Sequence, residues 1–580
     1  MNELEKRIVD STKDGTFLDV LYEEYRKHIG DDDELIRTLV GLHNQEKINI
    51  ISEFGLLRNE VSNSNFFIIR NIFRNLLPLL NVPVEEVKSC VKQLTIEAGS
   101  DMASHDLILP FIEFCSADIE RVESLLEQEL KVTDDDFDHI STALISGYKI
   151  NKKTYFNKAV QLLNHRNPII VQRVIFALSR FNYNEEPELA ATVVKEIITC
   201  TKSIEDEQIL STAINTLITL LSDYEELELD IIEFIEHNIG NNSPEFIFRI
   251  AQQLNYRHDS LSEGIQQLLF NFFKNLDTKY IGVIEQIDWY IYKKISSSNA
   301  LDISKLLEHL IDNNHSFQID ILSHSLQKIQ TQEFGEMLSV IFTRWLLKRE
   351  MIYCVSAVKL VKTSTSDQIK IGFDTGQVKV EDLMYLVNKA ISWFILQPLT
   401  SLNFILSILS MCSDSKIKLI EKNTFNYIAL NYSSQTKYFL QEHLNSSDKN
   451  TMNFSKNITQ QLEDFLQNFS NFHKIKELRP STKQRSEYAN HQQKLFDEAS
   501  SEPREELSFS SLFTKRVTLY GNKFIHKRQG SNGEMVRQVM PFSKMSHSID
   551  FPSLANLTPH TLQYFLSKFQ FEDLINETNS

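Results

Sequence analysis

Seven basic residues lie between Ser511 and His547 of this 580-residue chain, and Glu534 is the only acid in that segment. Seven bases and one acid give a local charge of +6, whereas the whole chain sums to −18, so the remainder sums to −24. Lysine and arginine bind phosphates, and aromatic rings among them can stack on bases. We therefore predict a contact surface for nucleic acid or for an acidic protein, formed by Lys515, Arg516, Tyr520, Lys523, His526, Lys527, Arg528 and Arg537.

The same segment has the pattern of a basic β-hairpin. Residues 516–520 and 535–540 have the composition of strands, and the glycine-containing residues 530–533 supply a turn. Alternate residues of a strand share a face, which would group Lys523 with Ile525 and Lys527, and Phe524 with His526 and Arg528. Such a hairpin can bind DNA or RNA, or it can dock on the acidic remainder of the chain or on an acidic partner. The sequence leaves both alternatives open and favours protein contact.

Motifs for catalysis or cofactor binding are absent from the sequence. It contains no phosphate-binding glycine loop, no dinucleotide fingerprint, no His-Glu-x-x-His motif, no nucleophile elbow and no EF-hand loop. The remaining enzyme hypothesis is a metal-dependent site near Asp374 or near His526. Neither residue has the ligand spacing of a known metal site. We therefore expect no catalytic residue, no cofactor and no metal.

The long part of the chain that precedes the basic segment is predicted to be helical. Only 15 Gly and 12 Pro interrupt the chain, and apolar residues recur at helical spacing up to about residue 475. With 42% apolar residues and 38 Phe, the chain can bury an extensive core. These features predict an all-α fold.

A weak repeat runs through the middle of the chain. Helices that open near residues 168, 206 and 244 carry Leu178, Leu217 and Leu254 at equivalent places, 39 and 37 residues apart. Each is followed by a second amphipathic helix, over residues 187–200, 226–237 and 261–276. Two antiparallel helices repeating about every 40 residues resemble the units of HEAT and armadillo proteins.

This resemblance is one of architecture. It implies an elongated α-solenoid of antiparallel, HEAT-like helix pairs. The strand and helix patterns of the C-terminal residues predict a small mixed α+β module after it. A non-repetitive bundle of helices is the alternative. We predict four regions: an N-terminal helical region at 1–60, the solenoid at 61–477, a polar linker at 478–510, and a basic module at 511–580 that combines the hairpin with a helix over 558–575.

Two stretches inside the predicted solenoid depart from the pattern. Residues 368–380 predict either a small hairpin or a loop that leads into a helix at Glu381. Residues 390–413 carry no charge and are long enough to span a membrane. Because Gln397 and Pro398 end one helix and start another, we predict a buried helical hairpin there and no membrane contact.

Cysteine usage and the start of the chain indicate the compartment. The five cysteines lie far apart without a Cys-x-x-Cys motif, and the first residues are polar, unlike a signal peptide. These features predict reduced core cysteines and a cytoplasmic location.

Taken together, these patterns predict a non-enzymatic scaffold or adaptor subunit of a multiprotein complex. The composition, rich in Ile, Asn, Lys and Phe, is typical of an AT-rich bacterial genome. By analogy with large helical subunits of bacterial operons, we expect an accessory role in a system that acts on foreign or damaged DNA, such as antiviral defence. Nucleic-acid binding by the basic module is the first alternative, and a metal-dependent enzyme is the second.

Overall fold

A computed structural model gives the fold of the chain. It describes residues 3–27, 33–59, 65–99, 101–131, 139–202, 204–296, 298–314, 316–348, 350–362, 371–470, 475, 480–491, 493–494, 523–529, 535–541 and 552–572. The chain divides into two compact units, Met1–Tyr290 and Ile291–Ser580.

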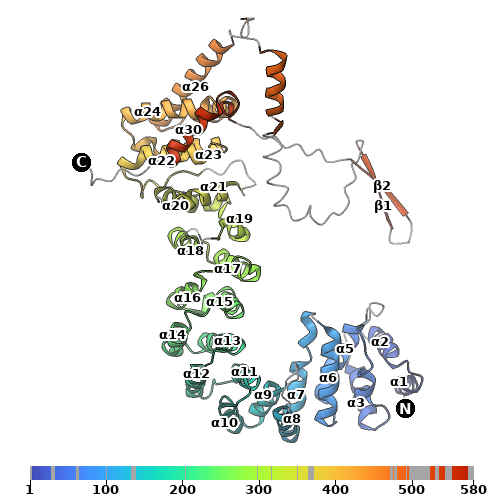
Figure 1. Ribbon diagram of the computed structural model, residues 1–580. Coiled ribbons are helices and arrows are strands. Elements are labelled where there is room, and N and C mark those ends of the chain that lie inside the picture. The colour runs from blue at the N-terminus through green and yellow to red at the C-terminus, as the bar shows by residue number, and fades with distance from the viewer. Residues whose placement is uncertain are drawn as a thin grey trace. The chain divides into compact units, whose positions relative to one another are not determined.

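The first unit is built from helices, shown in blue and green in Figure 1. Their bounds are α1 Glu3–Lys13, α2 Phe17–Lys27, α3 Asp33–Asn44, α4 Ile50–Phe54, α5 Phe66–Leu76, α6 Val84–Ala98, α7 Ile108–Ser116, α8 Ile119–Lys131, α9 Ile140–Ile150, α10 Lys152–Leu162, α11 Pro168–Leu178, α12 Pro187–Thr201, α13 Glu207–Asp223, α14 Glu228–His237, α15 Pro244–Arg257 and α16 Glu263–Phe270. The boundary between the units falls inside α17, Ile281–Lys294.

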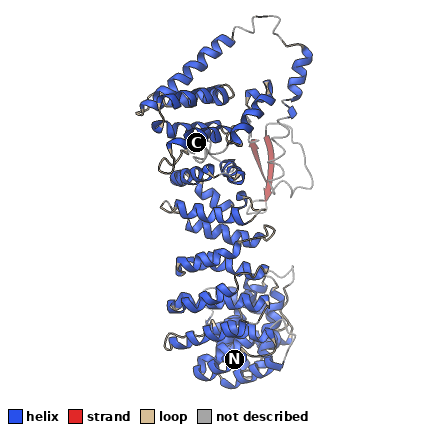
Figure 2. Cartoon of the chain, turned by 60° about the vertical axis from the view of Figure 1, so that its left-hand side comes forward, coloured by secondary structure: helices blue, strands red, loops and turns tan. Residues whose placement is uncertain are grey.

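The second unit continues with helices and contains one hairpin. Its elements are α18 Ala300–Asn313, α19 Ser323–Ile329, α20 Gly335–Leu347, α21 Met351–Lys362, α22 Leu383–Trp393, α23 Pro398–Ile408, α24 Asp414–Thr424, the π-helix η10 Phe425–Ala429, α25 Ser433–Glu442, α26 Lys449–Phe469, β1 Lys523–Gln529, β2 Met535–Pro541, α29 Ser553–Leu557 and α30 Pro559–Gln570. Strands β1 and β2 pair antiparallel and form the one sheet among the described residues (Figure 2).

Local chemistry fixes where the repeat helices begin. The Asn167 side chain accepts a hydrogen bond from the Ile169 amide, 2.9 Å away, and the following Pro168 is the first residue of α11. Asp206 accepts from two amides at the start of α13 in the same way. Such caps satisfy amides that have no partner within the helix. The predicted starts of α11, α13 and α15 are therefore confirmed.

The first unit arranges its helices in two rows. Helices α7, α9, α11, α13 and α15 form a first row in which each packs against the next, and α12, α14 and α16 form a second row. Leu178, Leu217 and Leu254 are fully buried in α11, α13 and α15. Truncating such a leucine to alanine typically costs about 2–5 kcal/mol. The prediction of an all-helical core is confirmed, and the paired rows are consistent with an α-solenoid.

In the second unit, α18, α20, α22 and α24 also pack in sequence. The uncharged stretch predicted as a helical hairpin forms the end of α22 and all of α23, and α23 starts at Pro398 as expected. Most of both helices is buried in the core. Within the described part of the chain, no helix combines the length and apolar character needed to cross a membrane.

The loop alternative is correct for the described part of residues 368–380. Residues 371–379 form no strand, and a 3-10 turn, Val380–Asp382, leads into α22. The Asp374 carboxylate accepts hydrogen bonds from the Gly376 amide at 3.1 Å and from Gln377 Nε2 at 2.7 Å. An Asp that bonds its own following backbone stabilises a turn. Residues 368–370 lie outside the described residues.

The region predicted as a polar linker contains an exposed helix at residues 482–491. Ser481 and Gln484 bond each other reciprocally at its start, which is a capping box that the sequence analysis missed. Beyond it, the predicted strand 535–540 is confirmed as β2 and the predicted terminal helix as α30. The predicted strand 516–520 and the turn at 530–533 lie outside the described residues. The four predicted region boundaries stay predictions.

Candidate functional site

A groove of about 590 Å³ opens on the first row of the first unit, across α11, α13 and α15. Polar side chains provide most of its walls. The lining residues are Gln172, Arg173, Phe176, Glu207, Gln208, Ser211, Thr212, Asn215, Glu245 and Arg249.

Helical spacing explains why these side chains share the groove. On α13, the polar residues Gln208, Ser211, Thr212 and Asn215 follow the spacing i, i+3, i+4, i+7, which places them on one face. The apolar residues of α13 occupy the other faces and form its core contacts. A stripe that is polar along two turns is the normal pattern for the side of a helix that meets solvent or a ligand.

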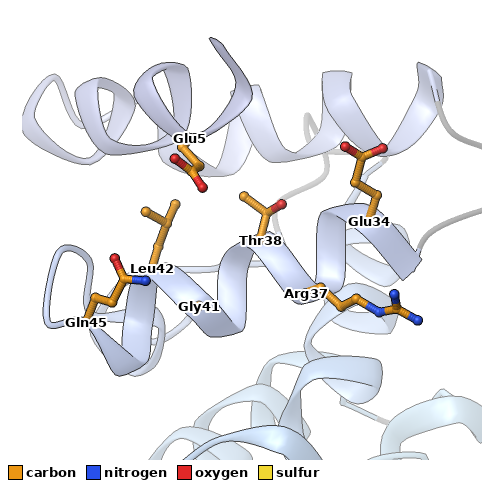
Figure 3. A pocket seen from close by; sticks show the side chains of 7 residues that line it. All are labelled: Glu5, Glu34, Arg37, Thr38, Gly41, Leu42 and Gln45. Carbon is orange, nitrogen blue, oxygen red and sulfur yellow. The ribbon is translucent and has the colours of Figure 1, made fainter. Parts of the chain in front are cut away.

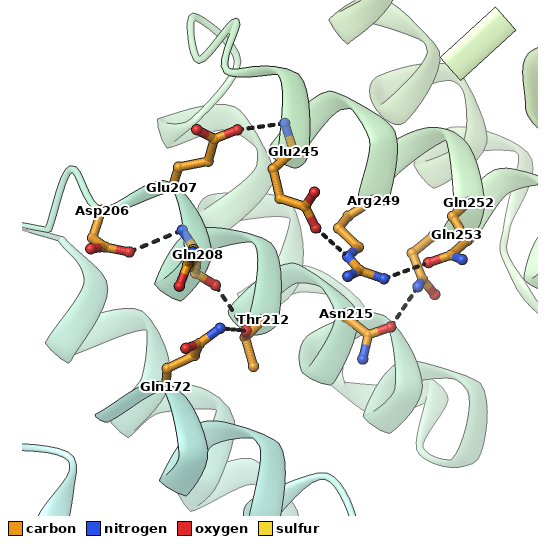
Figure 4. A network of polar contacts seen from close by, with 10 residues as sticks. All are labelled: Gln172, Asp206, Glu207, Gln208, Thr212, Asn215, Glu245, Arg249, Gln252 and Gln253. Atoms are coloured by element: carbon orange, nitrogen blue, oxygen red, sulfur yellow. Dashed lines mark hydrogen bonds and ion pairs between the residues drawn. The ribbon is translucent and has the colours of Figure 1, made fainter. Parts of the chain in front are cut away.

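The groove side chains form a network across the three helices (Figure 4). Gln172 Nε2 on α11 donates to Thr212 Oγ1 on α13 at 3.2 Å. Gln253 Nε2 on α15 donates to Asn215 Oδ1 on α13 at 2.7 Å. The groove therefore depends on hydrogen bonds between neighbouring helices of the first row as well as on the apolar core.

The charged residues of the groove, Arg173, Glu207, Glu245 and Arg249, sum to zero, and Glu245 and Arg249 form an ion pair. Arg249 Nε donates to Glu245 Oε1 at 2.9 Å, and Arg249 Nη1 donates to Gln252 Oε1 at 3.0 Å. The Glu245 amide donates to the Glu207 carboxylate at the start of α13. The groove consequently presents amides and hydroxyls rather than a strong field of one sign.

Two buried polar atoms of this region lack partners within the described structure. Ser211 Oγ lines the groove, its residue is 3% exposed, and no hydrogen bond to it forms. Gln253 is 4% exposed and uses its amide nitrogen on Asn215, while its Oε1 has no partner. Leaving a buried polar atom without a partner costs about 1–3 kcal/mol. Such an atom is stabilised by a polar neighbour other than the described residues, such as a water molecule or a ligand group.

The predicted basic contact surface is only partly within the described residues. Lys515, Arg516 and Tyr520 lie outside them. Four others, Lys523, His526, Lys527 and Arg528, lie on β1, and Arg537 lies on β2. The register pairs Lys527 with Arg537, so two cationic residues stand directly opposite each other.

Of the two residues considered for a metal site, Asp374 has described side-chain contacts. Asp374 is engaged in its own turn, and no three His, Cys, Asp or Glu side chains gather closely enough to hold a metal ion in the part of the chain that the structure describes. Burial raises the pKa of both Cys90 and Cys115 to about 12. Such thiols stay protonated and unreactive near neutral pH. The five cysteines are free, and four of them are buried.

A second recess, of about 450 Å³, lies between α1 and α3 (Figure 3). Glu5 of α1 faces Thr38 and Leu42 of α3 across it. None of its lining residues has a buried polar atom without a partner among the described residues. The groove on α11, α13 and α15 is therefore the better candidate.

Sequence reasoning missed this groove. Its signal was present in the polar stripe of α13, but a polar stripe by itself does not distinguish a solvated face from a binding face. Comparisons with family models and with curated proteins found no match to this chain.

Proposed function

We propose that this protein is a non-enzymatic scaffold or adaptor that binds a partner polypeptide in the polar groove of α11, α13 and α15. In this proposal the paired helices form a HEAT-like α-solenoid, and the hairpin belongs to a small mixed C-terminal module. A repeat array suits the role because it presents many side chains on one continuous surface.

The buried Ser211 hydroxyl without a partner is the single observation that carries this proposal. It lies in a groove whose other walls offer neutral donors and acceptors, and the two arginines and two glutamates of the groove sum to zero charge. A polypeptide supplies amides and carbonyls that match such walls. A strongly anionic ligand would find little net positive charge there.

Affinity purification from native cells with matched variants tests this function. Thr212→Trp fills the groove on the first row, whereas Lys195→Trp adds the same ring to an exposed position on α12 in the second row. We expect Thr212→Trp to lose the specific partner and Lys195→Trp to retain it. A partner that is retained by both variants would exclude the groove as its binding site.

Nucleic-acid binding by the hairpin is the second candidate, because Lys527 and Arg537 are register partners. Like charges directly opposite each other destabilise a two-stranded ribbon, and a bound phosphate would relieve that repulsion. This candidate also accords with the proposed accessory role in a bacterial system that acts on foreign or damaged DNA.

Fluorescence anisotropy with labelled single-stranded DNA and RNA tests the second candidate. We expect binding at about 50 mM salt that weakens at least about tenfold at 200 mM. The double variant Lys527→Ala/Arg537→Ala should abolish it, whereas Arg485→Ala in the exposed linker helix should not. Absence of binding at low salt would exclude this candidate. The remaining hypothesis is a metal-dependent enzyme. It predicts that elemental analysis of the purified protein finds a metal in a fixed molar ratio to the chain.

A further inference from the structure

Helix α22 has a polar face that is buried, whereas buried helix faces are normally apolar. Asn388, Lys389 and Ser392 are 7%, 5% and 1% exposed. Their spacing i, i+1, i+4 places them on one side of α22, and α30 packs against this helix. A side chain like that of Lys389 is almost never fully buried unless it is paired.

Each of these positions has a hydrogen-bond partner at the end of α30. Lys389 Nζ donates to the carbonyl of Gln570, the last residue of the helix. Asn388 Nδ2 donates to Glu572 Oε2 at 2.8 Å, and Gln570 Nε2 donates to the Ser392 carbonyl at 3.4 Å. Because a helix C-terminus carries partial negative charge, a lysine there is stabilising. The α22 face is therefore complementary to the end of a helix.

Aromatic contacts also hold α30. Tyr427, in the π-helix η10, has its ring centroid 5.2 Å from those of both Phe565 and Phe569. Phe569 and Leu562 are the buried apolar residues of α30. π-Helical turns occur often at functional sites. The spacing of Phe565 and Phe569, i and i+4, presents both rings to one Tyr.

The short helix α29 is attached to the same surface. Asn431 Oδ1 accepts from the Leu554 amide at 2.8 Å, and the Asn431 carbonyl accepts from Ser553 Oγ at 3.1 Å. These bonds hold the start of residues 552–572. The bonds from Asn388 and Lys389 hold the end of the same segment. Residues 552–572 are therefore held at both ends by one surface. We call it the α22–η10 surface, and it consists of Asn388, Lys389, Ser392, Tyr427 and Asn431.

This interface has the character of a contact that can open. A permanently buried helix face is normally apolar, whereas Asn388 and Lys389 donate hydrogen bonds to the end of the segment that covers them. Helix α30 has only 12 residues, too few to be stable alone in water. Between Phe469, the last residue of α26, and Pro552 the chain runs through residues 470–551, so α30 is distant in sequence from the surface that it covers.

We propose that the α22–η10 surface is a binding site for a short amphipathic helix with aromatic residues at i and i+4 and an acid just beyond its C-terminal end. Residues 552–572 are its intramolecular ligand, and they leave and rebind as a unit. Since residues 470–551 connect α26 to this ligand, its release frees one end of the segment that carries the basic residues. This inference is independent of the groove in the first unit.

A cleavable form of the full chain tests the inference. A protease recognition sequence is inserted after Glu506, the chain is cut, and the products are run on a size-exclusion column with and without an excess of a synthetic peptide of residues 552–572. We expect the two fragments to co-elute after cleavage and the peptide to displace the C-terminal fragment. Lys389→Met and Tyr427→Ala should each weaken retention about tenfold. Gln563→Ala, at an exposed position of α30, is the matched control and should leave retention unchanged.

Three outcomes would overturn the inference. Retention of the C-terminal fragment against excess peptide until the second unit unfolds would show that α30 is a permanent part of the core. Separation of the fragments in every variant, with no peptide binding, would show that the surface has no affinity for this helix. A dimer that forms only when the C-terminal segment is uncut would assign the surface to the helix of a second copy.

Discussion

Two polar helix faces in this protein differ in how their hydrogen bonds are satisfied. The face of α13 in the first unit is an open groove, where Ser211 Oγ and the nearby Gln253 Oε1 have no partner among the described residues. The face of α22 in the second unit is covered by α30, and Asn388 and Lys389 have partners on the covering segment. The chain thus supplies a ligand for one polar face.

The difference shows what distinguishes a binding face from a solvated one. Both stripes have the spacing of an ordinary surface helix, and their composition alone would not separate them. Each stripe contains a buried polar residue: Lys389 and Ser211 are 5% and 3% exposed, whereas Gln208 of the α13 stripe is exposed. On this basis we infer that the α13 face is completed by a ligand from outside the chain.

The largest expected effect is the loss of α30 from the surface that it covers. Phe569→Asp places a charge in the apolar contact with Tyr427 and should weaken docking of α30 by about 3 kcal/mol. Hydrogen exchange of residues 559–570 should then rise about a hundredfold, whereas α13 keeps its protection. Unchanged protection of α30 would mean that Phe569 does not hold the helix.

A smaller effect is expected from acid on a charged cluster in the second unit. Burial of Glu308 would raise its pKa, but hydrogen bonds from Arg344, Lys348 and Ser304 outweigh burial and hold the pKa below its ordinary value. A lowered folded-state pKa contributes stability that is fully present above the unfolded value, near 4.3, and is lost as pH falls through the folded value.

Hydrogen exchange of α18 and α20 between about pH 6 and pH 3 measures this effect. Exchange is compared after correction for its intrinsic pH dependence. Glu308→Gln should lower protection of both helices at the upper pH and flatten the pH dependence, because the variant has no carboxylate to protonate. An equally steep pH dependence in the variant would assign the acid sensitivity to another group.

The smallest effect is expected in the groove. Asn215→Ala removes the acceptor for Gln253 Nε2 and should destabilise the contact between α13 and α15 by about 1 kcal/mol. Arg249→Ala removes a half-exposed ion pair and should cost less than Asn215→Ala. Chemical denaturation of the first unit checks the order of the two variants, and a larger loss for Arg249→Ala would contradict the described network.

Much of the helical fold could be predicted from local residue chemistry. Asn167, Asp206 and Pro398 start helices because capping and proline geometry act over a few residues. The buried leucines of the repeat were visible because helical spacing is periodic. The short helix after Ser481 was missed because a polar composition obscured its capping box.

The candidate sites could not be predicted in the same way, because they depend on contacts between distant residues. Nothing near Lys389 in the sequence indicates that Gln570 covers it. The burial of Ser211 likewise results from the packing of α13 between α11 and α15. The basic segment was conspicuous because charge can be counted directly, and its role stays a prediction.

Site-specific photocrosslinking tests the central claim, that the groove binds a partner polypeptide, most directly. A photoreactive phenylalanine analogue replaces Thr212 in the groove or, as a control, the exposed Lys195 of α12, and cells of the native host are irradiated. The account predicts a discrete crosslinked polypeptide from position 212 that is absent from position 195. Crosslinking to nucleic acid alone, or the same products from both positions, would contradict it.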